Sequence, residues 1–294
     1  MIEYLYLVLY KSFAFFLNVL PDTWLDVGIR GLARFAYFAS KKRRHVILTN
    51  LSICFPDMPE AEKKAIGIHS YQNLLYAIAS FLNNKNLLEN IHYENRHYVD
   101  EAKKRGQKII FITAHFGVWE LLSGAISKGF DVPFSVVGRE LDSPLMQRYL
   151  RKGREQMGVE LINKRGALKG MIKALNTGRV LGLLIDQSIP KEMGEDVLFF
   201  DKKVPQTPAS SILAHKFDAV IIPIFISSED FKHHRVTCYA PIMIDKSIPK
   251  EEDLKRLNQA QAFAIQKAIQ ENPKEWFWSH KRFKVYDGAR YHDR

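Results

Sequence analysis

Short apolar runs alternate with amphipathic segments along the chain after residue 106. The apolar runs predict strands at Lys108–Ala114, Phe134–Val137, Val180–Ile185 and Ala219–Ile226. Helical spacing predicts helices at Trp119–Lys128, Ser143–Met157, Arg165–Asn176 and Lys255–Glu271. Strands that are apolar throughout and alternate with helices indicate a sheet buried on both faces. We therefore predict an α/β fold with a mostly parallel central sheet flanked by helices.

The first 20 residues are nearly all apolar or aromatic, interrupted by the charged residues Glu3 and Lys11. About 20 apolar residues are needed to cross a bilayer, and a charge in the middle of such a stretch is costly. Three interpretations stay open: a spanning helix, a helix lying in the membrane interface, and an ordinary buried helix.

A second hydrophobic helix is expected over residues 23–40. Its large apolar side chains gather near one face: Trp24, Val27, Leu32, Phe35 and Phe38. The basic cluster Lys41–Arg44 follows, and the positive-inside rule places such a cluster on the cytoplasmic side of a membrane. We expect residues 1–40 to form hydrophobic helices that attach the chain to a membrane, and residues 41–294 to form the α/β domain.

The composition narrows the classes of partner. Hydrophobic residues make up 47% of the 294 positions, so a sizeable core is expected, and the formal net charge is +11. A basic chain favours anionic partners such as nucleic acid, an anionic membrane, an acidic protein or a phosphorylated substrate. The basic residues are spread along the chain without a nucleic-acid-binding motif, so nucleic acid is the weakest of these. The only two cysteines, Cys54 and Cys238, make a disulfide framework improbable.

The segment FITAHFGVWELL contains the residues with the clearest chemistry. A predicted strand runs into His115, Gly117 follows in a loop, and the next helix includes Glu120. Residues five positions apart on one helix do not share a face, but a glycine turn between strand and helix can bring them together. The helix dipole favours a carboxylate such as Glu120 in the first helical turn.

Ligands of parallel sheets bind outside the carboxyl ends of the strands, where His115 is expected. We predict that the Glu120 carboxylate holds one imidazole nitrogen while the other faces substrate, as in the His-carboxylate half of a catalytic triad. A plain polar pair is the alternative. The spacing does not favour a zinc site, because HExxH is missing. A serine hydrolase is not favoured either, because the sequence has no GxSxG elbow. No metal or cofactor is therefore predicted.

Several sequence blocks resemble one family in the same order. AHFGVWE resembles the HxxxxD/E block of glycerolipid acyltransferases, specifically the HFGNWE form of the late lipid A acyltransferases, which are lauroyl and myristoyl transferases of Gram-negative bacteria. The other similar blocks are NLSICFP (Asn50–Pro56), the segment Val136–Ile162, the segment Leu183–Phe225 with its DQ pair, and NPKEWFWSHKRFK (Asn272–Lys284). The resemblance covers nearly the whole chain. It departs from the family pattern at Val118, Glu140 and Asp201, which leaves the acceptor and acyl-chain details open.

The resemblance implies a role for each block. His115 would be the general base that removes the proton of an acceptor hydroxyl as it attacks a thioester, and Glu120 would orient it. Arg139 would bind a phosphate or the developing oxyanion. Asp186 and Gln187 match the DQ pair and would organise the site. Helical spacing places Arg148, Arg151 and Lys152 on one face, and Arg154 extends this basic patch, which would either contact lipid phosphates or be an ordinary solvated face.

The resemblance also implies the partners and the location. The donor would be an acyl carrier protein, the acceptor a phosphorylated lipid A precursor, and the enzyme would work at the inner membrane with its catalytic domain on the cytoplasmic side. Two alternatives stay open: an acyltransferase for another glycolipid or phospholipid, and a basic membrane adaptor without chemistry. The adaptor does not explain why His115, Glu120, Arg139 and Asp186 fall at consecutive loop positions.

Overall fold

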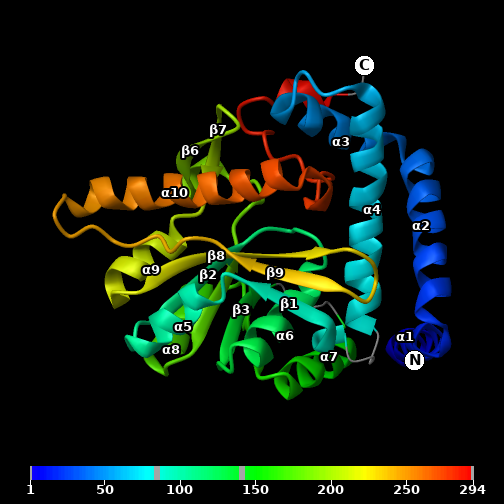
Figure 1. The fold of residues 1–294 in the computed structure, drawn as a ribbon, viewed down its shortest axis with the longest axis horizontal. Coiled ribbons are helices and arrows are strands. Elements are labelled where there is room, and N and C mark those ends of the chain that lie inside the picture. Colours follow the sequence, from blue (N-terminus) through cyan, green and yellow to red (C-terminus); the bar gives the residue numbers. More distant parts are fainter. Residues whose placement is uncertain (1, 83–86, 139–142, 293–294) are drawn as a thin grey trace.

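The computed structural model describes residues 2–82, 87–138 and 143–292 (Figure 1). Its α-helices are α1 (Ile2–Val19), α2 (Asp22–Ala39), α3 (Lys41–Cys54), α4 (Glu60–Leu82), α5 (His97–Lys104), α6 (Trp119–Gly129), α7 (Pro144–Gln156), α8 (Ala167–Asn176), α9 (Ala209–Phe217) and α10 (Lys250–Glu271). Its strands are β1 (Ile91–Glu94), β2 (Ile109–Thr113), β3 (Phe134–Gly138), β4 (Val159–Asn163), β5 (Val180–Leu184), β6 (Glu195–Phe199), β7 (Lys202–Gln206), β8 (Val220–Ser228) and β9 (His234–Cys238).

The central sheet has seven strands in the order β1-β9-β8-β2-β5-β3-β4. Every neighbouring pair is parallel except β8 and β9, which are antiparallel. Strands β6 and β7 form a separate antiparallel hairpin. The predicted α/β class with a mostly parallel sheet is confirmed, and the four predicted strands correspond to β2, β3, β5 and β8.

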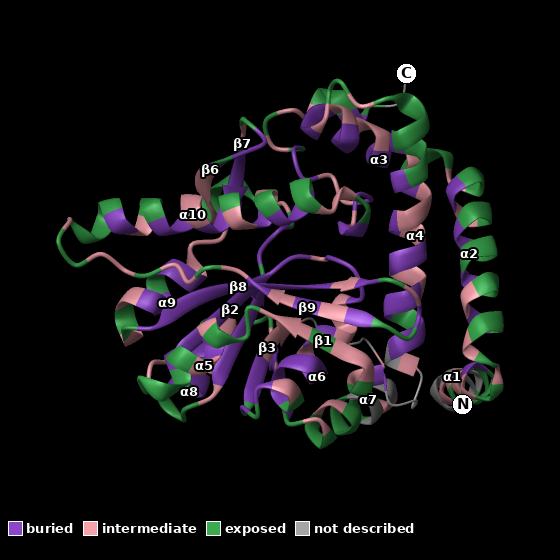
Figure 2. Ribbon diagram, viewed as in Figure 1, coloured by how far each residue is buried: buried purple, intermediate pink, exposed green. Residues whose placement is uncertain are grey.

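Helices cover both faces of the sheet. Side chains along each strand point alternately to opposite faces, so one strand contributes to the cores on both sides. On β2, Ile110 and Ile112 join the core that includes residues of α8, α9 and α10, whereas Ile109 and Phe111 join the core with α5 and α6. All four side chains are buried. In Figure 2, β2 and β8 are purple, which marks them as buried, and α10 lies above them.

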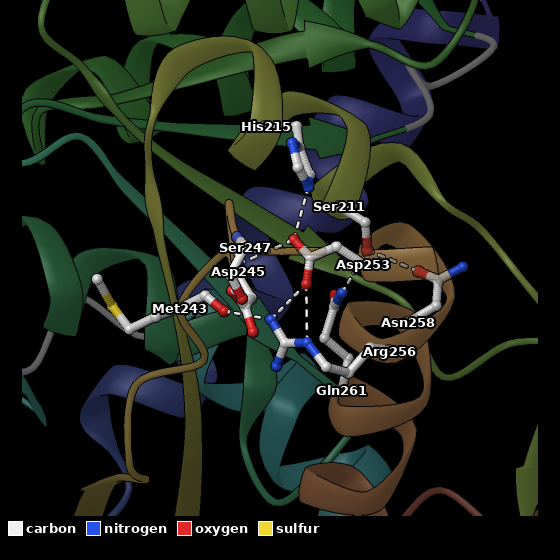
Figure 3. A network of polar contacts seen from close by, with 9 residues as sticks. All are labelled: Ser211, His215, Met243, Asp245, Ser247, Asp253, Arg256, Asn258 and Gln261. Carbon is white, nitrogen blue, oxygen red and sulfur yellow. Dashed lines mark hydrogen bonds and ion pairs between the residues drawn. The ribbon is translucent and has the colours of Figure 1, made fainter. Parts of the chain in front are cut away.

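Helix α10 is fixed to α9 by a buried polar network (Figure 3). Asp253 of α10 is fully buried and accepts hydrogen bonds from His215 Nε2 at 2.6 Å and from Arg256 Nε at 2.7 Å. The backbone N–H of Asp245 donates to the same carboxylate at 3.1 Å. A buried carboxylate is tolerated when charged partners and hydrogen bonds surround it in this way.

The N-terminal helices pack beside the α/β layers. Helix α2 runs along α4 (Figure 1), and its Leu25, Ile29, Ala33 and Tyr37 are buried on the side facing α4. The opposite side of α2 carries exposed apolar residues: Trp24, Val27, Leu32, Phe35 and Phe38. Among the residues that the structure describes, no helix combines the length and apolar character required to cross a membrane.

Candidate active site

The loop after β2 brings His115 to the carboxyl edge of the sheet, as the sequence predicts. The strand ends at Thr113, and α6 begins at Trp119. Gly117 between them has φ +54°, a left-handed conformation that favours glycine. A β-carbon at this position would collide with the carbonyl oxygen of Ile226 on β8. The glycine is therefore required both by the turn and by the close approach of the neighbouring strand.

Asp186 is the carboxylate that holds the His115 imidazole. His115 Nδ1 lies 2.8 Å from Asp186 Oδ1, and the backbone N–H of His115 donates to Asp186 Oδ2 at 3.1 Å. The indole Nε1 of Trp276 donates to the same Oδ2 at 2.9 Å. The pair forms because β2 and β5 are parallel neighbours, so the loops that follow them meet at one edge of the sheet.

The electrostatics of the pair favour an ionised carboxylate. Burial would raise the pKa of Asp186, which is only 3% exposed. The charge of His115 and the hydrogen bonds from His115 and Trp276 outweigh burial and lower this pKa to about 2. Burial has the opposite effect on His115 and lowers its pKa. The negative charges of Asp186 and Glu120 outweigh burial, so the His115 pKa is raised. At neutral pH the carboxylate is therefore charged and close to a readily protonated imidazole.

The hydrogen bonds fix the imidazole tautomer. Because an ionised carboxylate only accepts hydrogen bonds, Nδ1 of neutral His115 carries the proton and Nε2 carries the lone pair. The side-chain Nε2 of exposed Gln187 lies 3.3 Å from His115 Nε2. The amide N–H of Gln187 thus points at the lone pair of a potential general base, in a position that an incoming hydroxyl can take.

Glu120 occupies a different place from the one predicted. Its Oε2 lies 3.5 Å from Arg154 Nη2 on α7. Its charge raises the pKa of His115, but the orienting hydrogen bond predicted for Glu120 is made by Asp186 instead. The reason is topological: the loop after β5 lies directly beside the His115 loop, whereas the first turn of α6 directs Glu120 toward α7.

The predicted arginines fall in different environments. Arg139 lies outside the described residues. Arg148 and Arg151 are exposed on α7, and Arg151 pairs with Glu155 of its own helix at 2.9 Å. Arg154 is partly buried and reaches Glu120 beside the site. Of the three arginines on α7, the structure thus brings Arg154 to Glu120 of the AHFGVWE motif.

Two half-buried aromatic residues flank the imidazole and were not predicted as site residues. The ring of Trp119 has its centroid 5.3 Å from that of His115, and Phe277 lies 6.2 Å away. The two rings are 5.7 Å apart. The two rings form an apolar surface beside the His115 imidazole. Trp119 stands beside Glu120 in the motif and could have been suspected, whereas Phe277 comes from a distant part of the chain.

A second histidine lies in the same region. His280 Nε2 accepts a hydrogen bond from the backbone N–H of Ser188 at 2.9 Å. Burial and the nearby cations, Lys284 foremost, lower the pKa of His280 to about 4 despite attraction to Asp186. His280 is therefore neutral at physiological pH. Within the described ranges, no group of three or more His, Cys, Asp or Glu side chains is placed to hold a metal ion.

Comparisons with known proteins agree on one family. Residues 1–285 match the family model described as bacterial lipid A biosynthesis acyltransferase. The chain is 24% identical over 286 residues to the lipid A biosynthesis lauroyltransferase of Escherichia coli (strain K12), covering 90% of this chain and 91% of that protein. It is 27% identical over 255 residues to the lipid A biosynthesis acyltransferase of Haemophilus influenzae, covering 83% and 78%. The lipid A biosynthesis myristoyltransferase of E. coli (strain K12) is 22% identical over 273 residues, covering 90% and 82%.

Proposed function

Since the chain belongs to the bacterial lipid A biosynthesis acyltransferase family, we propose that it transfers a fatty acyl chain from an acyl carrier protein thioester to a hydroxyl of a phosphorylated lipid A precursor. The observation that carries the mechanism is the hydrogen-bonded pair of His115 and Asp186 at the carboxyl ends of adjacent parallel strands. A base held by a buried carboxylate, with its second nitrogen directed outward, suits the deprotonation of a hydroxyl.

The reaction follows from the tautomer. The acceptor hydroxyl replaces the Gln187 amide at His115 Nε2, and Nε2 removes its proton as the oxygen attacks the thioester carbonyl carbon. The tetrahedral intermediate then collapses: the C–S bond breaks, the ester forms, and the imidazolium returns the proton to the departing thiolate. Asp186 stays ionised throughout and stabilises the imidazolium. A well-placed general base contributes roughly 10²–10⁴ in rate.

Glu120 acts as a second negative charge in this scheme. It raises the proton affinity of His115, and its contact with Arg154 links the catalytic loop to α7. We assign Arg139 to the phosphate or oxyanion of the substrate, and the exposed Arg148 and Arg151 to lipid phosphates. Bidentate contacts with phosphate are the chemistry for which arginine is best suited.

Attachment to the inner membrane is part of the proposal. The outer side of α2 exposes Trp24 (73%) and Phe35 (70%), opposite the side buried against α4. On α1, Phe15 and Phe16 are also exposed. Aromatic and aliphatic side chains on one side of a helix favour a helix lying in the membrane interface. We place α1 and α2 in the cytoplasmic interface, next to the basic residues at the start of α3.

The docking of the donor is proposed to be electrostatic. Acyl carrier proteins are strongly acidic, and this chain has a formal charge of +11. Lys164, Arg165 and Lys169 are exposed around the start of α8, and Lys203 is exposed on β7. Complementary charge accelerates the encounter of two proteins and is screened by salt.

Mass spectrometry of lipid A from cells with and without the gene tests the proposed function. The presence of the protein should add the mass of one acyl chain, and plasmid-borne His115→Ala should leave the lipid A of the deletion strain unchanged. Unchanged lipid A in the deletion strain, together with an altered glycolipid or phospholipid, would assign another acceptor. Full activity of His115→Ala would rule out the mechanism.

A further inference from the structure

Residues 276–282, which follow α10 and are called the C-terminal segment below, contact both loops of the candidate site. The loop after β5 receives one contact at each of three consecutive residues. The Trp276 indole donates to Asp186 at 2.9 Å, Arg282 Nη1 donates to the carbonyl oxygen of Gln187 at 2.9 Å, and the N–H of Ser188 donates to His280. These contacts fix the position and orientation of the loop that carries the Asp186 carboxylate.

The same segment pairs with the loop after β2. The N–H of Phe277 donates to the carbonyl oxygen of His115 at 2.8 Å, and Phe116 forms an antiparallel bridge with Trp276. The N–H of Gly117 donates to the carbonyl oxygen of Glu275 at 2.8 Å. The backbone of the C-terminal segment thus acts as a short strand beside the histidine loop, while its side chains hold the aspartate loop.

The C-terminal segment is itself held from the opposite side. Asn50 of α3 donates to the carbonyl oxygen of Trp278 at 2.7 Å. Ser70 of α4 donates to the carbonyl oxygen of Trp276 and accepts the N–H of Trp278. Trp276 and Trp278 are 1% and 0% exposed. A segment this well buried and bonded is rigid enough to set the position of its neighbours.

We propose that Trp276 is a positioning residue of the His115–Asp186 pair, with its indole N–H aiming the carboxylate at the imidazole and sustaining its charge. The inference rests on the proposed general-base function. Asp186 Oδ1 receives the imidazole, while Oδ2 is held by the indole and the His115 backbone. Without the indole donor, Oδ2 keeps a single donor in a buried site, and the carboxylate is free to rotate away from Nδ1.

Loss of this donor has a defined sign. The charge of Asp186 and its hydrogen bond raise the pKa of His115. A carboxylate that turns away from Nδ1 stabilises the imidazolium less, so the His115 pKa falls. The acid limb of the pH–rate profile therefore moves to lower pH. A disturbed carboxylate also lowers kcat while leaving the groups that bind substrate in place.

The test is Trp276→Phe with Trp278→Phe as the matched control. The two tryptophans are both buried and their rings are 4.7 Å apart, but the Trp278 indole donates to the carbonyl oxygen of Pro273, away from the pair. We expect Trp276→Phe to lower kcat about 10- to 100-fold, the fold-change that one hydrogen bond to a charged group corresponds to. Its KM should stay within about twofold of wild type, and its acid limb should move to lower pH. Trp278→Phe should lose thermal stability with kcat and the acid limb near wild type.

Site-specific replacement of Trp276 by benzothienylalanine, which keeps the ring shape and lacks the N–H, covers the case in which the phenylalanine variant does not fold. An unshifted acid limb and a kcat equal to that of Trp278→Phe would overturn the inference. His115→Ala, assayed in parallel, distinguishes failure of the positioning role from failure of the proposed function. If it is inactive while Trp276→Phe behaves like the control, only the positioning role fails; if it is active, the proposed function fails first.

Discussion

Replacement of Asp186 by asparagine is the most incisive test of the pair. Three N–H groups point at the two carboxylate oxygens: His115 N, His115 Nδ1 and Trp276 Nε1. An asparagine can serve the two donors at Oδ2 with its carbonyl oxygen, but its NH₂ group then faces His115 Nδ1. The imidazole must accept that hydrogen bond, so its proton moves to Nε2. The lone pair needed for a general base then lies on the wrong nitrogen.

The size of the effect follows from the same geometry. The pKa of Asp186 falls from 3.8 to about 2 although the group is fully buried. At ~1.4 kcal/mol per pKa unit, this shift corresponds to a net stabilisation of the carboxylate of about 2 kcal/mol. With the wrong tautomer and no counter-charge for the imidazolium, we expect kcat to fall about 10³- to 10⁴-fold. The free energy of unfolding should fall by about 2 kcal/mol.

The assay is initial-rate acyl transfer from a carrier-bound donor to a detergent-dispersed acceptor, with thermal melting measured on the same preparations. Asp253→Asn is the matched control, because Asp253 is also a buried aspartate bonded to a histidine, His215, in the network of Figure 3. It should lose stability and keep kcat. Activity of folded Asp186→Asn within tenfold of wild type would refute the reasoning from the pair.

The remaining predictions concern pH, the donor and the membrane. The folded-state pKa of Asp186 is lowered, so its contribution to stability is present above about pH 4 and lost as pH falls toward 2; melting curves of wild type and Asp186→Asn should converge there. Glu120→Gln removes a charge that raises the His115 pKa, so the acid limb of kcat/KM should move to lower pH. The KM for the carrier-bound donor should rise between 0.1 and 1 M salt, where the Debye length falls from about 10 to about 3 Å; a flat KM would exclude electrostatic docking. Deletion of residues 1–20 should shift the protein toward the soluble fraction; unchanged sedimentation would leave the exposed apolar residues of α2 as the anchor.

The sequence predicted the parts of the fold that depend on short-range patterns. Strands β2, β3, β5 and β8 are apolar over most of their length, and each has side chains packed in the cores on both faces of the sheet. Strand β4 escaped prediction because Glu160 and Asn163 interrupt its apolar run at the sheet edge. The glycine turn at Gly117 was predictable because a strand, a histidine and a helix start are adjacent in the chain. A local pattern is enough when the contact it implies is also local.

The partner of His115 could not be found by the same reasoning. Glu120 is near in sequence and has the right charge, so spacing alone selects it. Asp186 is distant in sequence, and its position depends on β5 lying next to β2, which is a property of strand order. The sequence did single out Asp186 as the end of a strand, and parallel strands that end at one edge bring their following loops together. The sequence does not show that the two strands are adjacent. The contact of the Trp276 indole with Asp186 can be recognised only in the structure, where residues 276–282 pack against both loops.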